Sequence, residues 1–200
     1  MTIETAGIPS RLLADYAAVP ISFEVKSVLF AVKGTERPFD LIESRVDPPY
    51  VKNYDAIGDR PLDWAARFDT SQWVVFLARS DGRSLGGATL ALGTSGLHML
   101  EDRSDLAVLW DIRVMPKSRG RGVGRALIGA AETVARTRGY RELKVETQNV
   151  NVPACRFYAA LGFQLRVVRE NAYPECPGEA QFLWYKALHD SMSAADEHQP

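Results

Sequence analysis

A short loop rich in glycine and arginine separates a predicted strand from the most regular predicted helix of the chain. The strand covers Leu106–Met115, and the loop continues as Pro-Lys-Ser-Arg-Gly-Arg-Gly-Val-Gly-Arg over residues 116–125. In the helix, Gly122–Thr137, apolar residues recur at the i, i+3, i+4, i+7 spacing of one buried face. Three glycines within five positions weaken a helix start, so they indicate that something must approach the backbone closely.

This loop has the chemistry of an anion-binding site. The first N–H groups of a helix point toward an anion, with the helix dipole behind them. Arginines 119, 121 and 125 can add charge-assisted contacts to a phosphate. The alternative is a tight turn whose arginines face solvent. A Walker A loop is absent, and the dinucleotide pattern G-x-G-x-x-G would need glycine in place of Arg125.

Length and charge limit the class of protein. A chain of 200 residues suits one domain, and a net charge of −1 argues against a polybasic nucleic-acid binder. Residues 112–131 nevertheless hold five basic and no acidic side chains, which leaves 19 basic against 25 acidic elsewhere. Near-neutrality therefore conceals a local anion site beside an acidic remainder suited to a cationic acceptor. No apolar run is long enough for a membrane helix, and no secretory signal is visible. The two cysteines form no disulfide framework, so we expect a cytoplasmic protein.

The order of predicted elements favours one α+β domain around a mixed sheet. The prolines of Asp47-Pro48-Pro49 predict a turn that ends the second strand. We expect the domain to span residues 21–188, with a partly flexible N-terminal segment at 1–20, frayed over its first ten residues, and a flexible polar tail at 189–200. The other predicted strands are Ile21–Val32, Phe39–Val46, Trp73–Ala78, Ser84–Leu92, Leu143–Thr147, Phe163–Val168 and Gln181–Leu188, and the other helices are Pro61–Trp64 and Val152–Leu161.

Two motifs in order resemble the GCN5-related N-acetyltransferase (GNAT) family. The first is R-x-x-G-x-G over residues 119–124, and the second is N-x-x-A-x-x-F-Y-x-x-x-G-F over residues 151–163. Within that family the chain is most similar to the streptothricin acetyltransferases. That likeness rests on Trp110-Asp111-Ile112, on residues 146–151, on Ala172-Tyr173, on residues 182–185, and on residues 46–50 with Lys52. It implies a mixed, mostly antiparallel sheet flanked by helices and splayed between the 106–115 and 143–147 strands.

The resemblance also implies acetyl-CoA as co-substrate. The pantetheine arm would lie along Ile112 and Val114 like an extra strand, and Asn151 would contact it. Asparagine is also favoured at helix N-caps, and the two roles are compatible. The pyrophosphate would bind the backbone N–H groups of Arg119, Gly120, Arg121, Gly122, Val123, Gly124 and Arg125.

For catalysis, the resemblance makes Tyr158 the general acid that protonates the departing thiolate, with a packed core aromatic as the alternative. A lysine-like amine is only about 0.04% neutral at pH 7, so attack needs a base or a desolvating site. Asp111 and Glu146, on the two strands that flank the cleft, could take that proton or bind the cation. The alternative for each is a structural salt bridge, with Arg113 or Lys144. Aromatic residues that could line a cation site are Trp110, Tyr54 and Tyr173.

We therefore expect an N-acetyltransferase that moves the acetyl group of acetyl-CoA to a primary amine of a small molecule. The resemblance implies that this acceptor is an antibiotic of the streptothricin type. The amine would attack directly in a ternary complex, with a backbone N–H near Val114 stabilising the oxyanion. We expect no metal, because His98, His189 and His198 lack ligand spacing, and no nucleic-acid or membrane partner; a homodimer is compatible with the sequence. Two alternatives stay open. One is a non-catalytic acyl-CoA-binding module, and the other is a dinucleotide-dependent oxidoreductase, with Glu146 as its ribose-binding acid.

Overall fold

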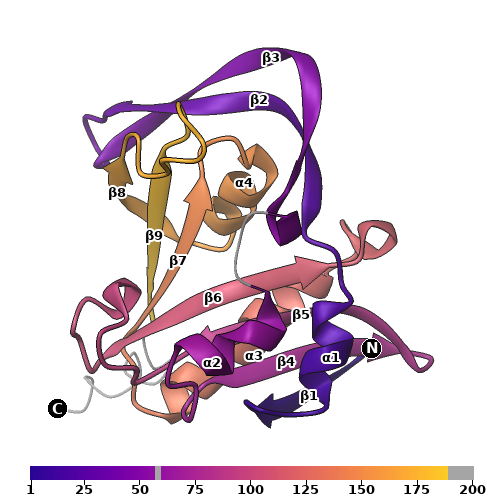
Figure 1. Ribbon diagram of the computed structural model, residues 1–200. Coiled ribbons are helices and arrows are strands. Elements are labelled where there is room, and N and C mark those ends of the chain that lie inside the picture. Colours follow the sequence, from indigo (N-terminus) through magenta and orange to yellow (C-terminus); the bar gives the residue numbers. More distant parts are fainter. Residues whose placement is uncertain (57–59, 189–200) are drawn as a thin grey trace, which may run out of the picture.

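The computed structural model describes residues 1–56 and 60–188. In this part of the chain a seven-stranded sheet has the order β1-β4-β5-β6-β7-β9-β8, and β2 and β3 form a separate two-stranded ribbon (Figure 1). The strands are β1 Thr2–Gly7, β2 Ser22–Lys33, β3 Phe39–Asn53, β4 Val74–Ser80, β5 Arg83–Ala91, β6 Leu106–Val114, β7 Glu142–Gln148, β8 Gln164–Arg169 and β9 Gln181–Ala187. The α-helices are α1 Leu12–Ala17, α2 Trp64–Arg67, α3 Val123–Thr137 and α4 Val152–Ala160.

The central pair of strands separates partway along its length. β6 and β7 run parallel and pair from Leu106 opposite Glu142 to Leu109 opposite Val145. The other neighbours in the sheet pair antiparallel. Beyond Leu109 and Val145 the two parallel strands no longer pair, although both continue. This confirms the predicted mixed, mostly antiparallel sheet and its splay.

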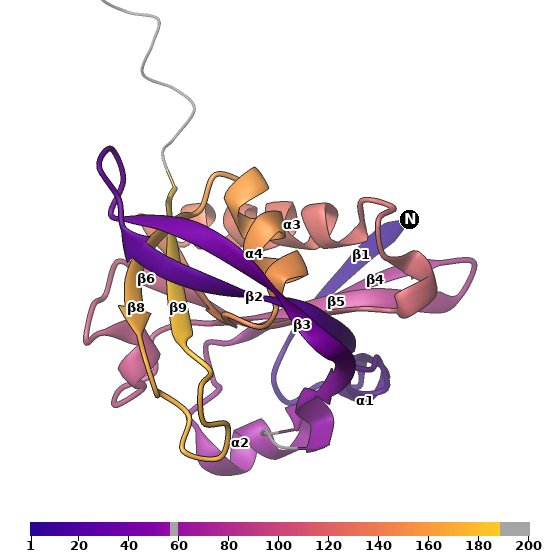
Figure 2. The same ribbon diagram turned by 90° about the horizontal axis from the view of Figure 1, so that it is seen from above.

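Helices cover both faces of the sheet. Figure 2 shows α3 and α4 on one face and α1 and α2 on the other. The alternation of β4 fits this arrangement, because Phe76 packs in the core cluster of α3 and Leu77 packs in that of α1 and α2. Burying each such side chain stabilises the fold by about 1.5–3 kcal/mol. No helix of the described residues is long and apolar enough to cross a membrane.

The β2–β3 ribbon crosses the splayed end of the sheet (Figures 1 and 2). Asn149, directly after β7, holds the ribbon at Leu29. The Leu29 N–H donates to the Asn149 carbonyl at 3.0 Å, and the Asn149 amide donates back to the Leu29 carbonyl at 3.2 Å. Leu29 itself is buried in the main core. These contacts hold the ribbon in place beside the gap between β6 and β7.

At the N-terminus the structure differs from our expectation. Residues 2–7 are not frayed, because β1 pairs with β4 from Thr2 opposite Arg79 to Gly7 opposite Val74. Leu12, Leu13 and Tyr16 of α1 are buried, so residues 1–20 belong to the domain. Short polar strands show little periodicity, and their stability comes from a distant partner. The expected tail at 189–200 lies outside the described residues.

The turn predicted at Asp47-Pro48-Pro49 was also wrong, because β3 continues to Asn53. The register places Tyr50 opposite Val25 but Arg45 opposite Ser27, so residues 46–49 bulge out of the ladder. Proline lacks an N–H and is tolerated in edge strands and bulges. A two-stranded ribbon has only edge strands, so it accommodates both prolines.

Candidate active site

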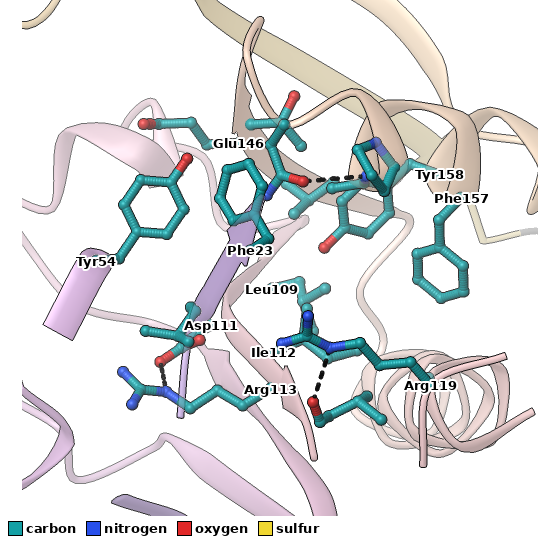
Figure 3. A pocket seen from close by; sticks show the side chains of 18 of the residues that line it. Phe23, Tyr54, Leu109, Asp111, Ile112, Arg113, Arg119, Glu146, Phe157 and Tyr158 are labelled. Carbon is teal, nitrogen blue, oxygen red and sulfur yellow. Dashed lines mark hydrogen bonds and ion pairs between the residues drawn. The ribbon is translucent and has the colours of Figure 1, made fainter. Parts of the chain in front are cut away.

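A cavity of about 990 Å³ occupies the gap where β6 and β7 separate. Its lining includes the end of β6, the glycine loop, the end of β7, one side of α4 and the start of the ribbon. Figure 3 shows Phe23 and Tyr54 across the cavity from Phe157 and Tyr158. The cavity therefore joins the loop predicted to bind an anion to the residues predicted to act on an amine.

The glycine loop presents its backbone at the start of α3. Gly120 and Gly122 have positive φ angles of +72° and +82°, and a Cβ at either position would meet no atom within 4 Å. The Ala126 N–H makes the first helical hydrogen bond, to the Gly122 carbonyl at 3.0 Å, so the preceding N–H groups lie before the helical ladder. Gly124 has a different function, because a Cβ there would lie 3.0 Å from the Phe157 ring. Two glycines thus shape the loop that we predicted to bind an anion, and the third lets α3 pack against α4.

The structure separates the roles of the three loop arginines. The Arg119 guanidinium donates to the Val114 carbonyl at 3.1 Å and to the Ser22 carbonyl at 2.8 Å. It therefore ties the end of β6 to the start of the ribbon, whereas we expected a contact to phosphate. Arg121 and Arg125 are exposed beside the glycines. These two side chains remain candidates for charge-assisted anion contacts.

The end of β6 offers a strand edge to the cavity. The Met115 N–H bonds to the Leu85 carbonyl of the β5 side at 2.9 Å, whereas the Val114 carbonyl turns away from β5 toward Arg119. Backbone groups alternate in direction along a strand, so Ile112 also presents its N–H and C=O toward the gap. A bulge at Trp110 precedes this edge. The Trp110 ring centroid lies 5.2 Å from that of Phe68 and 5.3 Å from that of Trp73. Trp110 and Tyr54 line the cavity, whereas Tyr173 is not among its lining residues.

Tyr158 is held on α4 with its hydroxyl directed into the cavity (Figure 3). Its ring packs 5.4 Å from Phe163 and 5.3 Å from Phe157. Burial above all, and then the charge on Asp111, raises the pKa of Tyr158, so the hydroxyl keeps its proton at neutral pH. The helix begins at Asn151, whose Oδ1 accepts from the Ala154 N–H at 3.3 Å. Tyr158 is thus a core aromatic whose protonated hydroxyl faces the cavity, and Asn151 is the N-cap of α4.

Asp111 forms the structural salt bridge that was its alternative role. Its Oδ2 lies 2.7 Å from Nε of Arg113, which also pairs with Asp55 at 2.6 Å. The other oxygen, Oδ1, is buried and has no hydrogen-bond partner in the described part of the chain. Burial raises the pKa of Asp111, and Arg113 opposes that shift. Asp111 also lines the cavity, but one of its oxygens is held by Arg113 and the other is buried.

Glu146 has different partners. Its Oε1 accepts from the Tyr173 hydroxyl at 2.6 Å, and its Oε2 accepts from Nε2 of Gln181 at 2.7 Å. Lys144, the expected ionic partner, instead binds Glu101 at 2.7 Å. Glu146 is half-buried and lines the cavity. The structure thus brings this carboxylate and Tyr158 to one cavity.

The sequence interpretation missed two glutamines of this site. Gln148 shares a strand face with Glu146, since the two are separated by one residue in β7. Gln181 is the cross-strand partner of Gln148 in β9. The period-2 pattern of β7 could have indicated Gln148. Nothing local marks Gln181, because its position depends on a pairing across 33 residues of chain.

The other reactive groups are less suited to catalysis. Cys155 is buried against Thr147, whose Oγ1 lies 3.3 Å from its Sγ, and burial raises the pKa of this thiol to about 11. It is therefore a small buried side chain rather than an activated nucleophile. No group of three or more His, Cys, Asp or Glu side chains that could hold a metal ion occurs in residues 1–56 and 60–188.

Comparison with known proteins gives the family. The acetyltransferase (GNAT) family profile matches residues 39–163. The streptothricin acetyltransferase of Streptomyces lavendulae is 30% identical over 163 residues, which cover 81% of this chain and 82% of that protein. Streptothricin acetyltransferase A of Bacillus subtilis (strain 168) is 28% identical over 145 residues, covering 72% of this chain and 76% of that protein.

Two solved structures have a similar fold. The crystal structure of nourseothricin acetyltransferase superimposes with a TM-score of 0.70 at 27% identity, covering 94% of this chain and 100% of that chain. A Bacillus anthracis str. Ames protein, solved in complex with acetyl coenzyme A, has the same fold, with a TM-score of 0.74 at 22% identity over 93% of this chain and 99% of that chain. The resemblance predicted from the two motifs is confirmed: the chain belongs to the acetyltransferase (GNAT) family and is an N-acetyltransferase.

Proposed function

We propose that this N-acetyltransferase transfers the acetyl group of acetyl-CoA to a primary amine of a small cationic molecule, an antibiotic of the streptothricin type. The observation that carries the proposal is a single cavity in which the glycine loop, the edge of β6, Tyr158 and Glu146 meet. Relatives named for streptothricin and nourseothricin cover most of the chain, which supports this acceptor class. A neighbour of the same fold holds acetyl coenzyme A, which supports the donor.

The backbone of one side of the cavity fits the donor. The N–H groups of residues 120–125 would bind the pyrophosphate, with Arg121 and Arg125 adding charge. The edge at Ile112 and Val114 would pair with the amide groups of the pantetheine arm as an added strand does. Asn151 lines the cavity next to this edge and would contact the same arm.

Side chains on the other side would carry out the proton transfers. Glu146 would accept a proton from the bound ammonium group, directly or through one water, which leaves a neutral amine. The amine nitrogen then bonds to the thioester carbon, a backbone N–H near Val114 would stabilise the developing oxyanion, and the carbon–sulfur bond then breaks. Tyr158 would give its proton to the departing thiolate. The acylated nitrogen would then lose its extra proton to the Tyr158 phenolate, directly or through water, and Glu146 would release its own proton to solvent. Asp111 was an equal candidate for the base, but its ion pair with Arg113 and its enclosed Oδ1 favour Glu146.

The test is a thiol-release assay with acetyl-CoA and a panel of amines: streptothricin, lysine, polyamines and peptide N-termini. We expect CoA thiol to appear fastest with streptothricin, with a reaction lacking amine as the control for hydrolysis. Calorimetry with acetyl-CoA and with NAD separates the alternatives. If acetyl-CoA binds but no amine of the panel causes release of the CoA thiol, the protein is an acyl-CoA-binding module. If NAD binds and acetyl-CoA does not, the protein is an oxidoreductase.

A further inference from the structure

A continuous row of hydrogen bonds connects the end of β3 to Glu146. The Tyr54 hydroxyl donates to Oε1 of Gln148 at 2.5 Å, and Nε2 of Gln148 donates to the Tyr173 hydroxyl at 3.1 Å. The Tyr173 hydroxyl in turn donates to Oε1 of Glu146 at 2.6 Å. From this row we infer that Tyr173 and Tyr54 are positioning residues, which hold Glu146 in the orientation that receives the acceptor amine. This inference rests on the proposed function.

Only one direction of donation satisfies every group in the row. An ionised carboxylate accepts but does not donate, so Tyr173 must donate to Glu146. The oxygen of Tyr173 then accepts from the amide nitrogen of Gln148, which turns the amide oxygen toward Tyr54. Burial raises the pKa of both tyrosines, so both remain protonated donors at neutral pH. Every proton in the row is therefore directed toward Glu146, and aligned bonds of this kind strengthen one another.

Some members of the row line the cavity, and Tyr173 does not. Glu146, Gln148 and Tyr54 line the cavity, whereas Tyr173 and Gln181 are not among its lining residues. Tyr173 holds one carboxylate oxygen and Gln181 holds the other, at 2.6 and 2.7 Å. Two fixed donors set the plane of the carboxylate. The remaining lone pairs of Glu146 are thus available to an ammonium group in the cavity.

The segment that carries Tyr173 has a second attachment to β3. Nζ of Lys52 lies 2.5 Å from Oε1 of Glu179 and 3.1 Å from Sγ of Cys176, all in a largely buried cluster. Glu179 and Cys176 follow Tyr173 in the connection between β8 and β9. Lys52 and Tyr54 are separated by one residue, so the end of β3 is joined to this connection directly through Lys52 and indirectly through Tyr54 and Gln148. The position of Tyr173 is therefore fixed by contacts that do not involve the substrate.

A double-mutant cycle tests the row. In Tyr173→Phe, Glu146 loses a hydrogen bond to a charged group, so kcat/KM for the amine should fall about 30-fold. Tyr54→Phe removes a bond between neutral groups and should lower kcat/KM about 5-fold. If Tyr54 acts through Gln148 and Tyr173, the double variant should be no worse than Tyr173→Phe alone. The KM for acetyl-CoA should stay at the wild-type value throughout.

The matched control is Tyr185→Phe, which removes a tyrosine donor from Glu101 outside the cavity and should leave kcat/KM unchanged. Gln148→Met breaks the row at its centre and should match Tyr54→Phe. Acetyl-CoA binding shows whether Tyr54→Phe is folded. If it is not, Gln148→Met replaces it in the double-mutant cycle with Tyr173→Phe. A double variant about 150-fold below wild type would overturn the inference, because the effects would then be independent. A wild-type protein that acetylates no amine would instead overturn the proposed function, and the inference with it.

Discussion

The two sides of the cavity are built in opposite ways. On the donor side, residues 118–120 and 122–125 of one loop and the adjoining edge of β6 line the cavity. On the acceptor side, Tyr54 and Gln148 bond to each other across 94 residues of chain, and Tyr173 reaches Glu146 from a different connection. The first side is a local property of the sequence. The second exists only after the ribbon and the sheet have assembled, so a few side-chain substitutions can change it without altering the donor side.

Tyr158 lies where the two sides meet, and its loss should have the largest effect. Tyr158→Phe keeps the ring packed on Phe163 and removes only the acidic hydroxyl. We expect kcat to fall about 1000-fold, because a positioned acid typically contributes 10²- to 10⁴-fold. The affinity for acetyl-CoA should change less than about 2-fold. Steady-state thiol release and calorimetry measure the two quantities.

A tyrosine outside the cavity provides the control for this change. Tyr140 is half-buried against the core and does not line the cavity. Tyr140→Phe should leave kcat unchanged. If Tyr158→Phe also turns over at the wild-type rate, then Tyr158 is not the proton donor, and the donor side supplies the acid in another way.

The two carboxylates provide the next test, because both line the cavity but only Asp111 is ion-paired with Arg113. Glu146→Gln should lower kcat/KM for the amine about 100-fold with unchanged acetyl-CoA affinity. Asp111→Asn should affect turnover much less, since Asp111 is ion-paired with Arg113, which also binds Asp55. Amine kinetics of both variants, with unfolding curves to verify the fold, decide between them. A larger loss of turnover in Asp111→Asn would assign the base to β6 instead of β7.

The same contrast explains what the sequence could predict. The helix at 122–137 and the glycine loop before it were predictable because their signals are local in the sequence. The splay was predicted from the resemblance to the family. The strand β1 was not, since its stability comes from pairing with β4 about seventy residues later. Asp47-Pro48-Pro49 is typical of a turn, and only the edge position of the ribbon makes it part of a strand. Gln181 has no local signal, because its function arises from its contact with Glu146.

A change at Gly122 should affect the donor side alone. Gly122 has a φ of +82°, a conformation in which a β-branched side chain is strained by about 1–3 kcal/mol. Gly122→Val should therefore weaken acetyl-CoA binding about 30-fold by calorimetry, while the KM for the amine stays constant. Gly129→Ala, in the same helix and with open space around its Cβ, is the matched control and should leave binding unchanged. Equal losses in the two variants would mean that helix α3, rather than the loop backbone, determines affinity.

Asn151 should give the smallest effect, and it tests whether the donor side uses any side chain besides its arginines. Asn151 caps α4 through Oδ1, which leaves its NH₂ group available to the pantetheine arm. Asn151→Ala should cost about 1 kcal/mol of unfolding free energy, a fall of about 2–4 °C in Tm, and about 5-fold in acetyl-CoA affinity. Asn151→Ser retains a capping oxygen but no amide, so it should restore the Tm and not the affinity. If serine restores both, capping alone accounts for Asn151, and backbone groups and the loop arginines suffice to bind the donor.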